Sequence, residues 1–280
     1  MNPTWTIAAL TIKEAIRRRL LIAFVVITAV IVGLSAWGFD RLSHTHSLTS
    51  GESNVAVPNA LILFMFMFSF VLALSASAIA SPSISSEIES GVLMTIVTRP
   101  VRRTEVLLGK WLGLAALLAG YAGGVCALEF GVVSWTSGFL PPSPLLAGVY
   151  LFAEGALLLT LSLFLSTRVP VIAAGVIGVA AFGAGWLAGV VGSLGTALNV
   201  AALRTVGEVG RFLLPTDGLW HAAIYYLQPP SLISEQLAAG GKGDPFEAQG
   251  GPSWAYLLWV ACWFLIVLIA AVASFERREL

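Results

Sequence analysis

Six long apolar segments constrain this chain of 280 residues more than any other feature. Each is roughly 20 residues long or more, enough for an α-helix to cross about 30 Å of hydrocarbon. Only 11% of the residues are charged, well below the fraction usual in soluble domains, which also indicates a lipid environment. The sequence therefore predicts an all-α membrane protein with six transmembrane helices in one domain, 1–280. The expected spans are 20–39, 59–80, 106–135, 145–166, 171–194 and 254–275.

Residues 1–19 precede the first span and end in three consecutive arginines. Trp5 and Ile16 can face lipid while the arginines face anionic headgroups, which favours an amphipathic interfacial helix. A cleaved signal peptide is the competing interpretation, because a basic cluster precedes an apolar core. The apolar run is longer than a typical signal-peptide core, and residues 35–37 are a poor cleavage site. We therefore expect the first span to be retained.

The lysines and arginines are divided unequally between the two ends of the spans. Loops on the cytoplasmic side of a membrane carry an excess of these residues. With the N-terminus inside, the outer set is Arg41, Arg204, Arg211 and Lys242, and three of these lie in one long loop. The larger, inner set is Lys13, Arg17, Arg18, Arg19, Arg99, Arg102, Arg103, Lys110, Arg168, Arg277 and Arg278. Both termini are therefore expected in the cytoplasm.

A charged stretch, 83–111, separates the second and third expected spans. Ile84, Ile88, Val92 and Ile96 fall four apart and would form one apolar stripe on a helix. A plain basic loop would explain the arginines of this stretch, but neither its acidic residues nor its apolar periodicity. We therefore favour a short amphipathic cytoplasmic helix that docks a soluble partner.

The segments expected on the outer side differ in length. Residues 40–58 are predicted to form a polar loop, whereas 195–253 is long enough to be structured. In this outer region one amphipathic helix is expected to stop before Pro215, and Thr216-Asp217 to cap a second. Pro229-Pro230 would end the second helix, and a third short helix is expected after it.

Two acidic residues, Glu129 and Glu154, lie within expected spans. A carboxylate at that depth is costly unless it faces the bundle interior, a cavity or a partner. One interpretation is a substrate cavity or a protonatable pair. The other is a neutral carboxyl hydrogen-bonded between helices, or a helix end nearer to water.

The sequence lacks the motifs that several types of catalysis require. It contains no GxxxxGK[ST] loop, so nucleotide hydrolysis would have to come from another chain. It contains no HExxH, GxSxG or CxxC motif either, and we expect no catalytic residue and no metal site. The formal net charge is zero, which implies no bulk attraction to nucleic acid.

The charged stretch also carries a family resemblance. The order Glu87-x-x-x-Gly91-x-Leu93, then Arg99-Pro100-Val101-x-Arg103-x-Glu105, then Gly109-Lys110, resembles the cytoplasmic signature of ABC-2 type transporter permeases. The layout of six spans matches as well, and so does Leu214-Pro215-Thr216-Asp217 in the outer region. The chain is most similar to the subgroup that includes the permease for nitrous-oxide reductase maturation. Val92 departs from the pattern, because the family often has Thr there.

The resemblance implies that 83–103 is a coupling region seated on a separate ATP-binding subunit. Its expected coupling residues are Glu87, Gly91, Leu93, Arg99, Pro100, Arg103 and Lys110. Two permeases, here a homodimer, would assemble with a dimer of ATPase subunits in a prokaryotic cytoplasmic membrane. This chain would contact membrane lipids and bind no cofactor, because ATP and Mg belong to the ATPase.

Three functions follow from these expectations. The first is an ABC-2 permease exporting a lipid-like, drug-like or peptide substrate, with Glu129 and Glu154 near the cavity. The second passes force to an extracytoplasmic protein without moving a bulk substrate, with contacts at Pro215, Asp217 and Trp220. The third is a membrane enzyme using the two glutamates, which predicts activity without any ATPase and its loss on Glu154→Gln.

Overall fold

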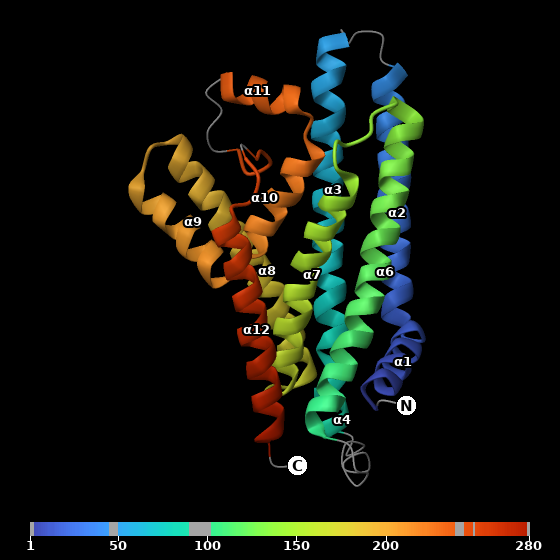
Figure 1. The fold of residues 1–280 in the computed structure, drawn as a ribbon. Coiled ribbons are helices and arrows are strands. Elements are labelled where there is room, and N and C mark those ends of the chain that lie inside the picture. Colours follow the sequence, from blue (N-terminus) through green and yellow to red (C-terminus); the bar gives the residue numbers. More distant parts are fainter. Residues whose placement is uncertain (1–2, 45–49, 90–101, 239–243, 249, 279–280) are drawn as a thin grey trace.

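The computed structural model describes residues 3–44, 50–89, 102–238, 244–248 and 250–278, and within them the chain is helical with no strand. Six helices are long and apolar enough to cross a membrane, which confirms the predicted number of spans. They stand side by side, and the N- and C-terminal ends lie at the same end of the bundle (Figure 1). The described helices are α1 (Pro3–Ile16), α2 (Arg19–His44), α3 (Ser50–Ala80), α4 (Pro82–Glu89), α6 (Arg103–Ser137), α7 (Pro144–Ser166), α8 (Val171–Ala197), α9 (Ala201–Leu213), α10 (Thr216–Leu227), α11 (Pro230–Ala238) and α12 (Trp254–Glu276).

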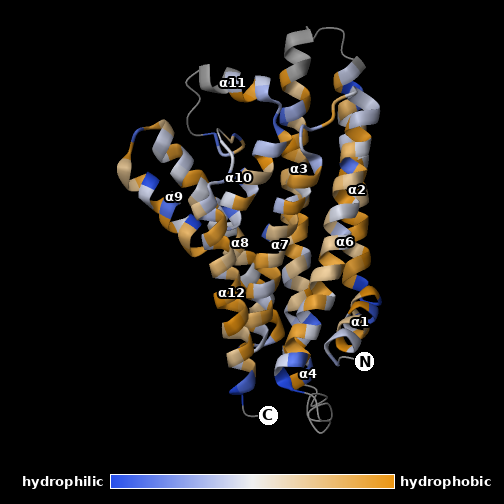
Figure 2. Ribbon diagram, in the orientation of Figure 1, coloured by the Kyte–Doolittle hydropathy of each residue, from blue (hydrophilic) through white to orange (hydrophobic). Residues whose placement is uncertain are grey.

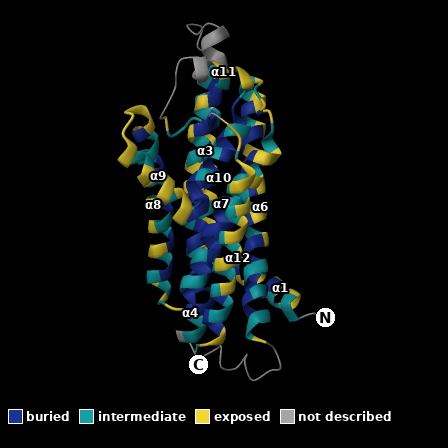
Figure 3. Ribbon diagram, turned by 60° about the vertical axis from the view of Figure 1, so that its left-hand side comes forward, coloured by how far each residue is buried: buried dark blue, intermediate teal, exposed yellow. Residues whose placement is uncertain are grey.

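The centre of the bundle is formed by α3 and α7, the two most buried spans, whereas α2 and α12 are the least buried. Two apolar clusters fill the interior. One surrounds Leu107, Leu118 and Leu163 near α4, and the other surrounds Met65, Phe130 and Trp220 toward the opposite end. The outward faces of the peripheral helices remain apolar and exposed, as expected of surfaces that lipid covers (Figures 2 and 3).

The predicted polar loop 40–58 is wrong. Helix α2 continues to His44 and α3 begins at Ser50, and 45–49 lie outside the described residues. The helices extend because apolar side chains in this segment still have packing partners. Val57 is buried in the cluster around Met65, Phe130 and Trp220, and Leu42 packs against that cluster. Polar composition marks the end of the expected hydrocarbon crossing, but tertiary packing extends the helix beyond it.

The predicted outer region contains three helices, α9, α10 and α11, as expected. Helices α8 and α9 form a hairpin that leans away from the bundle (Figure 1). They approach closely at Gly192 and Gly207, where a Cβ added to either residue would lie under 3 Å from the other's Cα. Helix α10 instead packs inward against α3, α7 and α8. The expected cap differs, because Pro215 is the N-cap of α10 and the Thr216 side chain makes no hydrogen bond within the described residues.

Candidate functional site

Helix α4 is the described part of the predicted coupling region, and it lies at the end of the bundle that holds both termini (Figure 1). It starts at Pro82, directly after α3, where proline is tolerated because the first helical N–H needs no partner. Ile84 is fully buried in the adjacent apolar cluster, and Ile88 packs against the same cluster. Two of the four residues of the predicted apolar stripe, Ile84 and Ile88, therefore face the spans, and Val92 and Ile96 lie outside the described residues.

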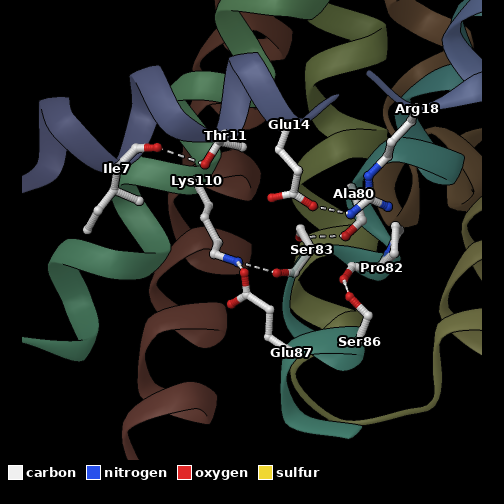
Figure 4. A network of polar contacts seen from close by, with 10 residues as sticks. All are labelled: Ile7, Thr11, Glu14, Arg18, Ala80, Pro82, Ser83, Ser86, Glu87 and Lys110. Atoms are coloured by element: carbon white, nitrogen blue, oxygen red, sulfur yellow. Dashed lines mark hydrogen bonds and ion pairs between the residues drawn. The ribbon is translucent and has the colours of Figure 1, made fainter. Parts of the chain in front are cut away.

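A buried lysine joins α4 to α6. Lys110 lies in the second turn of α6, and its side chain is only 7% exposed. Its Nζ lies 2.5 Å from Oε1 of Glu87 and also donates to the backbone carbonyl of Ser83 (Figure 4). A buried ammonium needs such a counter-charge and acceptor, because burial removes its hydration. Two residues predicted to contact an ATPase thus pair with each other inside the chain.

A serine fixes the opposite side of α4. The Ser85 hydroxyl lies 2.7 Å from the Ser166 carbonyl and 2.9 Å from the Val169 carbonyl. These acceptors belong to the end of α7 and to the turn that leads into α8. The short helix is therefore bonded to α6 on one side and to the α7–α8 turn on the other.

Helix α1 packs on α6 beside the same lysine. A Cβ added at Gly109 would lie 2.8 Å from the Thr4 carbonyl oxygen, and one at Gly113 would lie 2.6 Å from the Ala8 carbonyl oxygen. Only glycine permits this approach, which matches the small-x-x-x-small spacing of close helix pairs. Figure 4 shows Thr11 and Glu14 of α1 above Lys110. The sequence analysis missed this contact, although the spacing of Gly109 and Gly113 was the available signal.

Arg103, another predicted coupling residue, also contacts other residues of this chain. Its NH1 donates to the carbonyls of Phe275 and Glu276, over 3.4 and 3.1 Å, and to that of Arg278 over 2.7 Å. A cation at these carbonyls satisfies the end of α12 and interacts favourably with its dipole. Arg103 thereby ties the start of α6 to the end of the last span.

The remaining predicted coupling residues lie outside the described residues. These are Gly91, Leu93, Arg99 and Pro100. Their contact with an ATPase stays a prediction. The described part of the region shows how α4 is attached. One ion pair, one serine and two apolar side chains connect α4 to the spans.

The two membrane carboxyl groups do not meet. Glu129 accepts a hydrogen bond from Ser35 of α2 over 2.9 Å, and Glu154 accepts one from Ser69 of α3 over 2.8 Å. Both glutamates are at least 98% buried. The cavity beside Ser69 has a volume of about 10 Å³, which holds about one water. This geometry is that of carboxyl groups hydrogen-bonded between helices, and their place in a substrate cavity stays a prediction.

The predicted outer contact residues form a second polar junction. Asp217 and Trp220 are buried, and Asp217 Oδ2 lies 2.7 Å from Arg211 Nε and 3.5 Å from His221 Nδ1. The Pro215 carbonyl accepts a 2.5 Å hydrogen bond from the Tyr256 hydroxyl of α12. These residues hold the outer region to the spans. Their contact with an outer protein stays a prediction.

Comparisons with known proteins agree with this arrangement. A model of the ABC-2 family of transporter proteins matches residues 5–280. The chain is also similar to the probable ABC transporter permease protein NosY of Stutzerimonas stutzeri, with 31% identity over 164 residues. That alignment covers 54% of this chain and 57% of the relative, so the chain spans little more than half the length of the curated relative it matches.

Proposed function

This chain belongs to the ABC-2 family of transporter proteins, and from that membership we propose that α4 couples it to a separate ATPase subunit. In this proposal the chain is the permease, and ATP hydrolysis in the partner drives export of a lipid-like, drug-like or peptide substrate. The observation that carries the proposal is the attachment of α4. A short helix transmits displacement only if it is fixed to the elements that must move.

The contacts of α4 support transmission to several spans at once. Lys110 links the helix to α6 through Glu87 and Ser83, and Ser85 links it to the α7–α8 turn. A force applied to α4 would therefore reach three spans directly. Among the described residues, the Ser86 hydroxyl bonds only to the Pro82 carbonyl within α4 itself, and its side chain is partly exposed, which supports contact of this part of the helix with a partner.

The proposed assembly contains two copies of this chain and two ATPase subunits, with α4 and both termini in the cytoplasm of a prokaryotic cell. The excess of lysine and arginine on this side supports the orientation. ATP and Mg bind to the ATPase, and this chain supplies neither catalytic residues nor metal ligands.

Copurification tests the coupling proposal. An ATPase encoded beside this chain should copurify with the wild type and with Arg17→Gln, an exposed control on the same side. Glu87→Arg reverses the charge beside Lys110 and should displace α4, and Gly91→Trp alters the predicted contact itself. Both variants should fail to copurify the ATPase, or should copurify an ATPase whose ATP hydrolysis no longer depends on the permease. Equal binding by all four proteins, or binding by none, would contradict the proposal.

A second candidate function passes force to an extracytoplasmic protein. It is favoured by the way α12 holds the outer region, since Trp259 and Trp263 donate to the carbonyls of Phe212 and Leu213. Movement of the last span would thus displace the α9–α10 connection. Retention of a specific outer protein on the purified complex would support this function, whereas substrate-stimulated ATP hydrolysis without such a protein would support export.

A further inference from the structure

A basic pocket lies where the α7–α8 turn meets the end of α12. It has a volume of about 280 Å³ and is lined by Thr167, Arg168, Ser274, Arg277 and Arg278. The turn and the end of α12 are more than a hundred residues apart in the sequence. Three guanidinium groups from two distant segments therefore converge on one hollow, at the end of the bundle that carries α4.

The arginines are positioned by the chain but keep donors for a ligand. Arg168 Nε donates to the Ser274 hydroxyl over 2.6 Å, and Arg278 donates through NH1 to the Thr167 carbonyl. Each guanidinium has five N–H donors in a planar fork. Most donors of these two side chains are therefore unused within the described residues.

The described part of the chain does not balance the charge of the pocket. Within the described residues, none of its three arginines forms an ion pair with a carboxylate. Nor are they required to complete the end of α12, because Arg103 already donates to the carbonyls there. The pocket therefore has a surplus of positive charge and of N–H donors.

The two helices that meet at this pocket also carry exposed apolar side chains. Ile172 in the first turn of α8 is 81% exposed, and Ile269 of α12 is 65% exposed. Both helices pack on α7, which lies between them. A ligand that suits this environment has an anionic head for the arginines and apolar chains for the helices.

We propose that the pocket binds the phosphate-bearing headgroup of an anionic phospholipid. Arginine forks match phosphate oxygens, and basic pockets between spans at the cytoplasmic surface suit anionic lipids. The assignment to the cytoplasmic leaflet rests on the orientation in the proposed function. The lipid would brace the same α7–α8 turn that accepts the Ser85 hydrogen bond from α4.

Native mass spectrometry of the full chain in detergent tests this site, with phosphatidylglycerol and phosphatidylcholine as probes. The wild type should bind phosphatidylglycerol more tightly than phosphatidylcholine. Arg168→Gln/Arg277→Gln should weaken phosphatidylglycerol binding by roughly 30-fold, since each arginine near a lipid surface contributes a fixed increment of binding. The control is Arg204→Gln, which removes a positive charge from α9, toward the opposite end of the bundle (Figure 1), and should leave the phosphatidylglycerol affinity unchanged.

A single variant keeps the test decisive if the double variant does not fold. The Arg277 side chain makes no recorded hydrogen bond within the described residues, so Arg277→Gln removes charge without breaking an internal contact; it should weaken binding by roughly fivefold. Unchanged phosphatidylglycerol affinity would overturn the proposal, as would displacement of the lipid by millimolar inorganic phosphate. So would loss of ATPase binding in the variants with lipid affinity intact, because the arginines would then serve a protein partner. The titration uses the chain alone in detergent, so its outcome is independent of whether α4 couples to an ATPase.

Discussion

Two ion pairs of the short helices, Glu87–Lys110 between α4 and α6 and Arg211–Asp217 between α9 and α10, differ in their access to water. At the end of the bundle that holds α4, Lys110 and Glu87 have side chains that are only 7% and 20% exposed. At the outer junction, Asp217 is 2% exposed but its partner Arg211 is 43% exposed. If Asp217 is replaced, the Arg211 side chain can therefore turn into water and remain solvated. The inner lysine has no such route, so its attachment of α4 depends on the pair remaining intact.

The junctions also differ in the groups that they hold. The junction at α4 includes a pair of charged side chains, Lys110 with Glu87, beside the hydrogen bonds of Ser85 to backbone carbonyls. The contacts of α12 with the predicted outer region go to backbone carbonyls, which accept hydrogen bonds from Tyr256, Trp259 and Trp263. The ion pair depends on residue identity on both partners, whereas the contacts of α12 need only its donors.

The largest expected effect is at the inner pair. Glu87→Gln leaves the Lys110 ammonium buried without the carboxylate that pairs with it directly, and should lower the free energy of unfolding by about 4 kcal/mol. Glu87→Leu/Lys110→Met removes both charges and should recover most of that loss, because a buried ion pair can often be replaced by apolar groups. Unfolding of the purified protein in detergent measures both. A single variant as stable as the wild type, or a double variant no better than the single one, would show that the pair does not hold α4.

The outer pair should respond asymmetrically. Arg211→Ala leaves the Asp217 carboxylate buried, with His221 nearby, and should lower the free energy of unfolding by about 3 kcal/mol. Asp217→Asn leaves only an arginine that can reach water, so its effect should be about 1 kcal/mol. The same unfolding measurement compares the two variants. Equal losses of stability in the two variants would show that the greater exposure of Arg211 has no consequence for the pair.

The close packing of α1 on α6 can be tested separately at the same end of the bundle. Gly113→Ala places a methyl group against the Ala8 carbonyl and should lower the free energy of unfolding by about 2 kcal/mol. Gly120→Ala is the matched control on the same helix, because an added Cβ there meets nothing within 4 Å. That control should be neutral or stabilising by about 0.5 kcal/mol, since alanine favours helix more than glycine does. Similar results for the two variants would show that the close approach at Gly113 does not contribute to stability.

The smallest expected effect is at the outer clamp. Trp263→Phe removes the N–H that donates to the Leu213 carbonyl over 2.9 Å, and should lower the free energy of unfolding by about 1 kcal/mol. Trp254→Phe alters an indole that is 86% exposed and should have no measurable effect. If both substitutions behave alike in thermal unfolding, the indole hydrogen bonds do not hold the outer region.

The spans were predictable because hydrocarbon thickness imposes a length and a composition on each of them. The described part of the apolar face of α4 was also predictable, since Ile84 and Ile88 follow helical spacing. The ends of α2 and α3 were not, because Leu42 and Val57 pack against partners that are distant in sequence.

The roles of the charged residues were harder to predict than their location. Lys110 and Arg103 belong to a basic segment that suggests an exposed surface, yet one is buried against Glu87 and the other caps α12. Asp217 similarly followed a motif in an outer region but lies inside the bundle. A motif gives the identity of a polar residue, whereas its partner depends on which helices meet there.

Site-specific photo-crosslinking from α4 tests the central claim most directly. A photoreactive residue would replace Ser86, which within the described residues bonds only inside α4, in cells that also make the ATPase encoded beside this chain. The control position is Trp135 near the opposite end of the bundle, which is 92% exposed. The account predicts a crosslink to the ATPase from position 86 and none from position 135. No crosslink from position 86, or one from position 135, would contradict the assignment of α4 as the coupling helix on the cytoplasmic side.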